Sequence, residues 1–232
     1  MKISILTLFP EMFSGPFDHS IVKKAKEKKL VDVNFVNIRD FGVGPHKIVD
    51  DKSYGGGHGM ILRVDVLEKA ITQTKNKNLG ILEQKVVLLS PHGKTFNQRK
   101  ALEFASLKHL ILVCGHYEGI DERIKKFIDE ELSIGDFIVT GGEIPAMLVT
   151  DAVARLVKGV LKEGVTSTES FSEILEYPQY TKPNNYKTLA VPSILLSGNH
   201  EKIKSWRDKI SHRTTEKLRP DLLRSNRSLL GR

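Results

Sequence analysis

Apolar and polar positions alternate along the first two thirds of the chain in a way that predicts strands and helices in turn. Short apolar runs predict strands, and apolar residues three or four positions apart predict amphipathic helices. Strands are predicted at 2–8, 31–38, 86–89, 110–114 and 133–139, and helices at 17–30, 65–74, 97–107 and 143–157. This alternation predicts an α/β fold, in which a mostly parallel sheet carries helices on both faces.

The stretch from Leu110 to Met147 contains the strongest indication of a ligand site. Its apolar run Leu110–Cys114 is typical of a strand buried on both faces, and a second strand-like run covers Ser133–Val139. Ligands of open α/β sheets lie just beyond the carboxyl ends of strands. Five glycines near these ends leave main-chain groups bare enough to hold a flat, polar ligand such as an adenine: Gly115, Gly119, Gly135, Gly141 and Gly142. The alternative is that these glycines only form turns.

The composition changes after residue 160. Residues 161–172 are rich in Lys, Glu, Gly, Ser and Thr, which is typical of a flexible linker. We therefore predict one domain at 1–160, a linker at 161–172 and a small C-terminal helical domain at 173–232. Within that domain we predict helices at 201–211 and 214–223, with Trp206 as their apolar anchor.

The charge distribution favours a nucleic-acid partner. The chain has a formal net charge of +8, and residues 201–232 hold ten Lys or Arg against four Asp or Glu. Such a segment suits a phosphate backbone, although a solvated helical face has the same composition. The long loop 38–60 adds a glycine-dense turn, Tyr54–Gly59, next to basic residues. Two interpretations of this loop remain open: it follows an RNA backbone, or it is a mobile surface loop.

Several classes of protein and site are excluded by what the sequence lacks. No apolar run approaches a membrane span or a signal peptide, so we expect no membrane partner and a cytoplasmic location. The single cysteine, Cys114, excludes an internal disulfide. A phosphate-binding P-loop would need glycine at Leu88, and a dinucleotide fingerprint would need glycine at Met60. The histidines lack the spacing of a zinc site, and no metal is expected.

Nine sequence blocks, in order, resemble those of one known family. They are LTLFPEMF, IRDF, YGGGHGM, LSPHGKTFNQ, CGHYEGIDER, SIGDFIVTGGEIPAM, DAVARL, PQYTKP and SGNHEKI. On these blocks the chain resembles the bacterial tRNA (guanine-N1)-methyltransferases of the SPOUT superfamily. Those enzymes use S-adenosyl-L-methionine to methylate the guanine immediately 3′ of the anticodon, at position 37 of tRNA.

The resemblance implies more than the residue pattern alone. It implies that domain 1–160 is a trefoil-knotted cofactor-binding domain, that the C-terminal domain binds RNA, and that the protein is a homodimer with its active site at the subunit interface. It also implies a cofactor pocket formed by Leu89, Ser90, Pro91, Gly93, Gly115, Tyr117, Glu118, Gly119, Ile134, Gly135, Asp136, Phe137, Ile138, Val139, Gly141, Gly142 and Pro145.

The chemistry of the reaction suggests two catalytic residues. Guanine N1 carries a proton at neutral pH, so a base must remove it, and negative charge develops on O6. The family has an aspartate before a Ser-Phe pair as this base, and here the position is Glu169. We expect Glu169 to act as the base and Arg155 to stabilise O6. A simpler interpretation pairs Arg155 with Asp151, one helical turn earlier.

Two departures from the family pattern affect only details of RNA contact. Ser53 stands where the family often has proline, and Lys182 where it often has arginine. Two other functional classes also remain: a SPOUT enzyme that methylates another RNA position, and an RNA-binding protein without activity.

Overall fold

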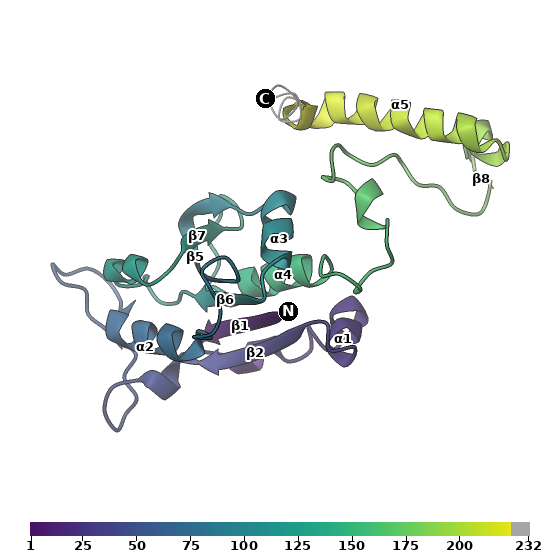
Figure 1. Ribbon diagram of the computed structural model, residues 1–232. Coiled ribbons are helices and arrows are strands. Elements are labelled where there is room, and N and C mark those ends of the chain that lie inside the picture. The colour runs from purple at the N-terminus through teal and green to yellow at the C-terminus, as the bar shows by residue number, and fades with distance from the viewer. Residues whose placement is uncertain (224–232) are drawn as a thin grey trace, which may run out of the picture. The chain divides into compact units, whose positions relative to one another are not determined.

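The computed structural model describes residues 1–223 and divides the chain into two compact units (Figure 1). Unit 1 comprises Met1–Lys162, and unit 2 begins at Glu163. Of the helices within residues 1–223, none combines the length and the apolar character needed to cross a membrane. The last nine residues of the predicted domain 173–232 lie outside the described part of the chain, and so do three of its basic residues, Arg224, Arg227 and Arg232.

Unit 1 is built on a five-stranded sheet in which every neighbouring pair of strands is parallel. Its order is β2-β1-β6-β5-β7, so β6 lies in the middle, between two strands that both precede it in the sequence. The strands are β1 (Lys2–Thr7), β2 (Asp32–Asn37), β5 (Gln84–Thr95), β6 (His109–Cys114) and β7 (Glu130–Ser133). The predicted α/β class with a mostly parallel sheet is confirmed.

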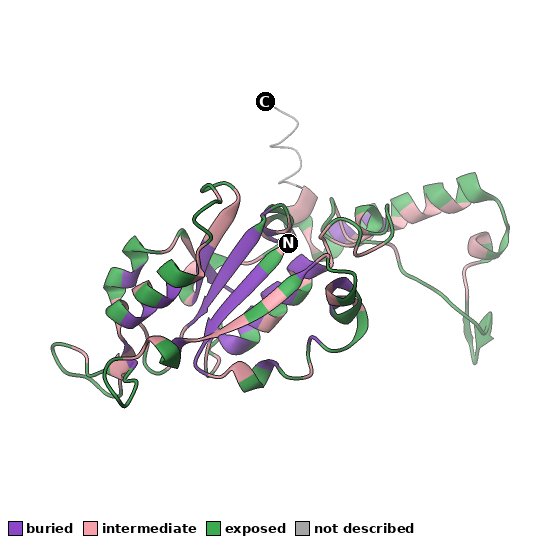
Figure 2. Cartoon of the chain, turned by 60° about the horizontal axis from the view of Figure 1, so that its bottom comes forward, coloured by how far each residue is buried: buried purple, intermediate pink, exposed green. Residues whose placement is uncertain are grey.

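Helices cover both faces of this sheet, and the strand side chains alternate between them. Leu110, Leu112 and Cys114 of β6 pack in one apolar core with α1 (Ser20–Glu27), α3 (Gln98–Ala105) and α4 (Glu143–Ala154). Ile111 and Val113 pack in a second core with α2 (Val64–Thr74) and the short 3-10 helix η3 (Glu122–Lys126). Figure 2 shows the buried strands between these partly exposed helices. Because β6 is buried on both faces, its sequence is apolar at every position after His109.

The predicted strand at 133–139 is wrong, because β7 covers Glu130–Ser133 and ends where that prediction began. Glu130 and Glu131 make this strand difficult to recognise from the sequence, because charged residues are not typical of a strand in a buried sheet. Glu130 lies 2.9 Å from the Nζ of Lys100, and Glu131 lies 3.3 Å from the Nζ of Lys125. These lysines offset the charges, so an acidic segment can form an edge strand.

The loop at 38–60 is more ordered than a structureless connection. It contains a 3-10 helix, η2 (Ile38–Phe41), and a strand, β3 (Asp50–Asp51), which pairs antiparallel with β4 (Ile61–Leu62). Tyr54 at its tip is fully exposed. At its end, the carbonyl of Met60 accepts a hydrogen bond from the N–H of Glu118 at 3.1 Å. The loop is therefore anchored to the predicted ligand site.

Unit 2 contains one long helix, α5 (His200–Leu218), where two were predicted. The expected break at 212–213 holds neither glycine nor proline, and the helix ends at Leu218, with Arg219 as its C-cap just before Pro220. Trp206 is only half buried, whereas Thr215 is fully buried and accepts a hydrogen bond from the N–H of Leu175 at 3.0 Å. The remaining elements are η4 (Thr166–Thr168), β8 (Asn185–Tyr186), β9 (Leu189–Ala190) and η5 (Ser193–Leu196), and in unit 1 η1 (Pro10–Phe13).

A buried histidine at the start of β6 makes the stability of unit 1 depend on pH. His109 is 2 % exposed, and its Nε2 lies 2.9 Å from the Oγ of Ser4. Burial is the main cause that lowers the pKa of His109 from 6.5 to about 4. The charge of Lys2 lowers the pKa by a smaller amount, which outweighs the increase due to the charge of Asp32. Between these values the unfolded chain binds a proton that the folded chain does not.

We therefore expect the free energy of unfolding to fall by about 2 kcal/mol between pH 7 and pH 5 through His109 alone. Urea unfolding followed by circular dichroism at both pH values measures the change, and the His109→Gln variant supplies the comparison without an imidazole. An equal pH dependence in the variant and the wild-type protein would contradict this assignment.

Candidate functional site

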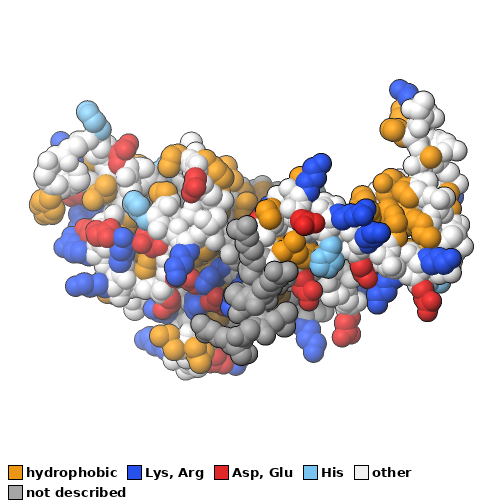
Figure 3. Space-filling model, turned by 90° about the horizontal axis from the view of Figure 1, so that it is seen from above, with side chains coloured by type: hydrophobic (Ala, Val, Ile, Leu, Met, Phe, Trp, Pro, Cys, Tyr) orange, Lys and Arg blue, Asp and Glu red, His pale blue; other side chains and the backbone are white. Residues whose placement is uncertain are grey.

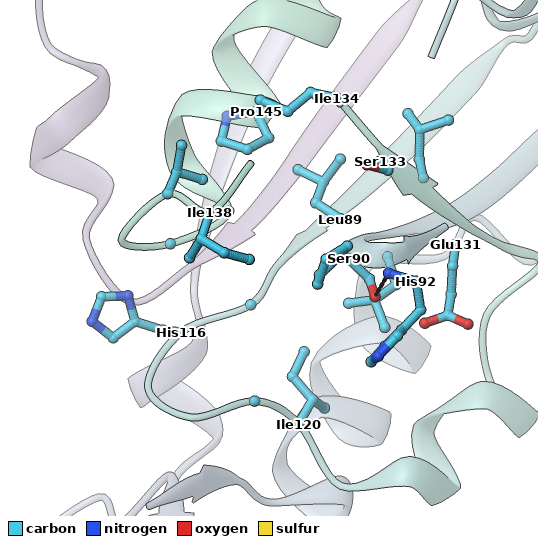
Figure 4. Close-up of a pocket in the computed structure, with 18 of the residues that line it drawn as sticks. Leu89, Ser90, His92, His116, Ile120, Glu131, Ser133, Ile134, Ile138 and Pro145 are labelled. Atoms are coloured by element: carbon cyan, nitrogen blue, oxygen red, sulfur yellow. Dashed lines mark hydrogen bonds between the residues drawn. The ribbon is translucent and has the colours of Figure 1, made fainter. Parts of the chain in front are cut away.

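Unit 1 has a cavity of about 510 Å³ at the carboxyl ends of three neighbouring strands. Its walls are the end of β5 with the residues that follow Leu89, the loop after β6, and the segment between β7 and α4. Figure 4 shows Leu89, Ile134 and Pro145 reaching it from three different parts of the chain. The position agrees with the rule that ligands of parallel sheets bind beyond the carboxyl ends of strands.

Most residues of the predicted cofactor pocket line this cavity. Fifteen of the seventeen are found there: Leu89, Ser90, Pro91, Gly115, Tyr117, Glu118, Gly119, Ile134, Gly135, Phe137, Ile138, Val139, Gly141, Gly142 and Pro145. Gly93 and Asp136 are not among the lining residues.

The structure gives Gly93 a different role. Between Leu89 and Lys94 the pairing of β5 with β7 is interrupted, and both of these residues face Leu132. The backbone of Gly93 packs directly against the backbone of Leu132, where a Cβ atom would overlap. The glycine therefore lets β5 bulge and rejoin β7, and the bulge carries Ser90 and Pro91 to the cavity.

Close approach of two main-chain segments shapes the floor of the cavity. The N–H of Gly142 donates to the carbonyl of Gly115 at 2.8 Å, which ties the start of α4 to the end of β6. A Cβ atom on Gly142 would lie 2.6 Å from the Cα of Cys114. Gly119 and Gly135 have φ angles of 139° and 144°, which L side chains rarely adopt. These glycines are thus required by the backbone itself.

A buried carboxylate lies beneath this floor. Glu143 is 2 % exposed, and its Oε1 accepts a hydrogen bond from the Oγ1 of Thr7 at 2.7 Å. Burial, and to a smaller extent the nearby carboxylate of Glu143, raises the pKa of Cys114 well above its ordinary value. A buried thiol whose pKa is raised in this way is a poor nucleophile, so Cys114 has a packing role here.

The cavity also includes residues that the sequence analysis did not select. His92, His116 and Thr140 lie within or beside the selected runs, so a continuous reading of those runs would have included them. The N–H of His92 donates to the Oγ of Ser90 at 3.2 Å, as Figure 4 shows. Lys125 and Glu131 also line the wall, as an ion pair that no local sequence signal indicates.

The two predicted catalytic residues belong to different units. Arg155 directly follows the last turn of α4, and its N–H donates to the carbonyl of Asp151 at 3.3 Å. Glu169 follows η4 in unit 2, and its carbonyl accepts hydrogen bonds from both the N–H and the Oγ of Ser172, at 3.1 and 2.7 Å. The main chain at Glu169 is therefore held in a compact turn.

The cavity can hold a ligand through main-chain groups and apolar side chains. Among residues 1–223 no three His, Cys, Asp or Glu side chains are grouped as metal ligands. Bare N–H and C=O groups at the glycines are available to form hydrogen bonds with a polar ring, and the lining side chains of Leu89, Ile134 and Ile138 offer apolar surface for its faces. The arrangement suits an organic molecule with a flat polar part.

Comparison with known proteins shows similarity over nearly the whole chain. Residues 1–225 match the family described as "tRNA (Guanine-1)-methyltransferase TrmD". A tRNA (guanine-N(1)-)-methyltransferase of Carboxydothermus hydrogenoformans is 54 % identical over 227 residues, which is 97 % of this chain and 88 % of the relative. Proteins of the same name from Dictyoglomus turgidum and Metamycoplasma arthritidis are 51 % and 52 % identical, over 96 % of this chain and 90 % and 96 % of their own lengths.

Proposed function

Because the chain belongs to the tRNA (guanine-1)-methyltransferase family, a SPOUT class of enzyme, we infer that it methylates N1 of guanine in tRNA. The match across the chain carries this conclusion, and the cavity at the strand ends agrees with it. We further propose that the target is the guanine immediately 3′ of the anticodon, at position 37. A cytoplasmic location and the trefoil knot are parts of the same proposal, and both stay predictions.

S-adenosyl-L-methionine is the methyl donor in this proposal. The cavity of about 510 Å³ falls within the range of small-molecule sites, and its glycine main chain suits the edge of an adenine. When bound, this cofactor supplies an activated methyl group on a positively charged sulfur. We propose that the fifteen cavity-lining residues named above bind it; Gly93 acts through the bulge of β5, and a contact from Asp136 stays a prediction.

The chain's own residues then prepare the acceptor base. Glu169 removes the proton from guanine N1, so that the nitrogen lone pair is free to take the methyl group. Arg155 places its guanidinium beside O6, where negative charge develops as the proton leaves. Methyl transfer needs no covalent intermediate with the protein, but the methyl group and guanine N1 must be held close together and in line. The main contribution of the protein is therefore to hold the cofactor and the tRNA base in place.

A homodimer with the active site at the subunit interface is also part of the proposal. Exposed apolar side chains near the cavity support it. Ile144 and Leu148 lie one turn apart on the outer side of α4 and are 50 % and 45 % exposed, while Phe137 and Ile138 line the cavity and are also exposed. Burying such a surface against a second copy would remove it from water.

One assay tests the proposed function against its alternatives. Labelled methyl groups should pass from S-adenosyl-L-methionine to an unmodified tRNA transcript with guanine after the anticodon, and not to a transcript with adenine there. Transfer to another RNA or another position would indicate a different SPOUT methyltransferase. Binding of tRNA without transfer would indicate an RNA-binding protein that has lost its activity.

Gly142 offers a test of the cofactor site. Because a Cβ atom there would lie 2.6 Å from the Cα of Cys114, the Gly142→Ala variant must displace the start of α4 from β6. We expect its affinity for S-adenosyl-L-methionine to fall at least about tenfold, as measured by titration calorimetry. Gly80→Ala is the matched control, since a Cβ atom at Gly80 meets only a side-chain oxygen of Glu83, at 3.9 Å. Equal affinities of the two variants would contradict the assignment.

A further inference from the structure

Unit 2 has a cavity of its own, about 310 Å³ in volume. It lies between the extended segment 177–184 and the side of α5, and apolar side chains from Val191, Leu195 and Leu196 close it. From α5 it is lined by Ile203 and Arg207, which are one helical turn apart. The catalytic chemistry proposed above does not use this cavity.

Arg207 is held in place there with one buried N–H donor, at Nε, that has no acceptor among the described residues. Its guanidinium carbon lies 4.4 Å from the centre of the Tyr177 ring, a cation–π contact that fixes the plane of the group. Its Nε is buried and has no hydrogen-bond partner among the residues that the structure describes. A buried N–H donor that stays unpaired costs free energy, and the other four donors of the guanidinium can bind the same acceptor. The site is thus suited to an acceptor from outside the unit.

The surroundings indicate what that acceptor is. The planar N–H groups of arginine match the oxygens of a phosphate in a two-bond arrangement. Lys182 brings a second positive charge to the same cavity, and the ring of Tyr180, which is 48 % exposed, offers a face on which a base can stack. A phosphate next to a flat ring is the chemistry of a nucleotide.

We propose that this cavity binds one nucleotide of the RNA substrate. The phosphate would lie on Arg207 and Lys182, and the base would stack on the ring of Tyr180. The inference rests on the proposed function, because it takes tRNA as the substrate. The charge of α5 suits the phosphate backbone of RNA, because the helix has six Lys or Arg and three Asp or Glu. Figure 3 shows Lys and Arg side chains on this unit beside a group of hydrophobic side chains.

The test measures tRNA binding by the full chain over a series of salt concentrations. We expect Arg207→Gln to weaken binding at least about tenfold and to make the slope of log affinity against log salt less steep by about one. Lys209→Gln is the matched control, because Lys209 is exposed and lies about 200° further round α5. The Lys209→Gln variant loses the same positive charge as Arg207→Gln, and its affinity for tRNA should change little. At saturating tRNA, Arg207→Gln should keep its turnover rate while its KM for tRNA rises.

A second variant keeps the test decisive if Arg207→Gln is poorly folded. Lys182 is exposed, so Lys182→Gln should fold normally and still lose several-fold in affinity for tRNA. Unchanged binding in both variants, or an equal loss in Lys209→Gln, would overturn the proposal, as would an effect on self-association in place of RNA binding. If the wild-type protein neither binds nor methylates tRNA, it is the proposed function that fails.

Discussion

Replacing Glu169 by glutamine is expected to lower the rate of methyl transfer to tRNA by a factor of about 10² to 10⁴, which is the usual contribution of a general base. Glutamine keeps nearly the same shape but cannot accept the N1 proton of guanine. The turn at Glu169 should persist, because it depends on the main-chain carbonyl, which accepts two hydrogen bonds from Ser172. The measurement is single-turnover transfer of labelled methyl groups at saturating cofactor and tRNA.

Two further variants serve as controls for the Glu169→Gln variant. Glu169→Asp keeps a carboxylate of similar basicity and introduces the residue that is expected at this position in the family. This variant should therefore retain most of the rate of methyl transfer. Glu163→Gln removes an exposed carboxylate from the same segment and should retain full activity. If Glu169→Gln keeps most of the rate, the base lies elsewhere in the protein.

Replacing Arg155 by alanine is expected to slow methyl transfer by a factor of about 10² to 10³, while the affinity for S-adenosyl-L-methionine stays within about twofold. The physical reason is that the guanidinium opposes charge that develops on guanine O6 during proton removal, and this charge is absent when only the cofactor is bound. Parallel measurements of single-turnover rate and cofactor affinity separate the two effects.

Lys158→Ala is the control for Arg155, since it removes an exposed positive charge three residues further along the chain. Its rate should equal that of the wild-type protein. Should Arg155→Ala abolish cofactor binding, the residue serves the cofactor pocket and its proposed role at O6 is wrong. Should the variant keep its full rate, the simpler interpretation of an ordinary helix pair with Asp151 would be favoured.

The sequence predicted best those elements whose residues show their surroundings directly. β6 is apolar at every position after His109 because it is buried on both faces, and the predicted strand 110–114 lies within it. The predicted helix 65–74 differs from α2 by one residue. By contrast, β7 was missed because its glutamates are offset by lysines from other parts of the chain. Ion pairs of that kind appear only after the chain has folded.

The same division applies to the candidate site. The rule for strand ends and the family blocks both pointed to residues near 115–119 and 134–142, and the cavity lies there. Neither could show that Gly93 packs against the backbone of Leu132, or that Glu143 is buried beneath the floor with Thr7. These are contacts between residues distant in sequence, and they follow from the order of strands in the sheet.

By itself the amino-acid sequence determined the α/β class, the family and most of the residues around the cavity, because these depend on local patterns and on blocks that can be read along the chain. Only the tertiary structure decided the strand order, the volume and walls of the cavity, and the second cavity, in which Arg207 lies over Tyr177. The reason is physical: these features arise where separate segments pack, and packing depends on all the segments at once.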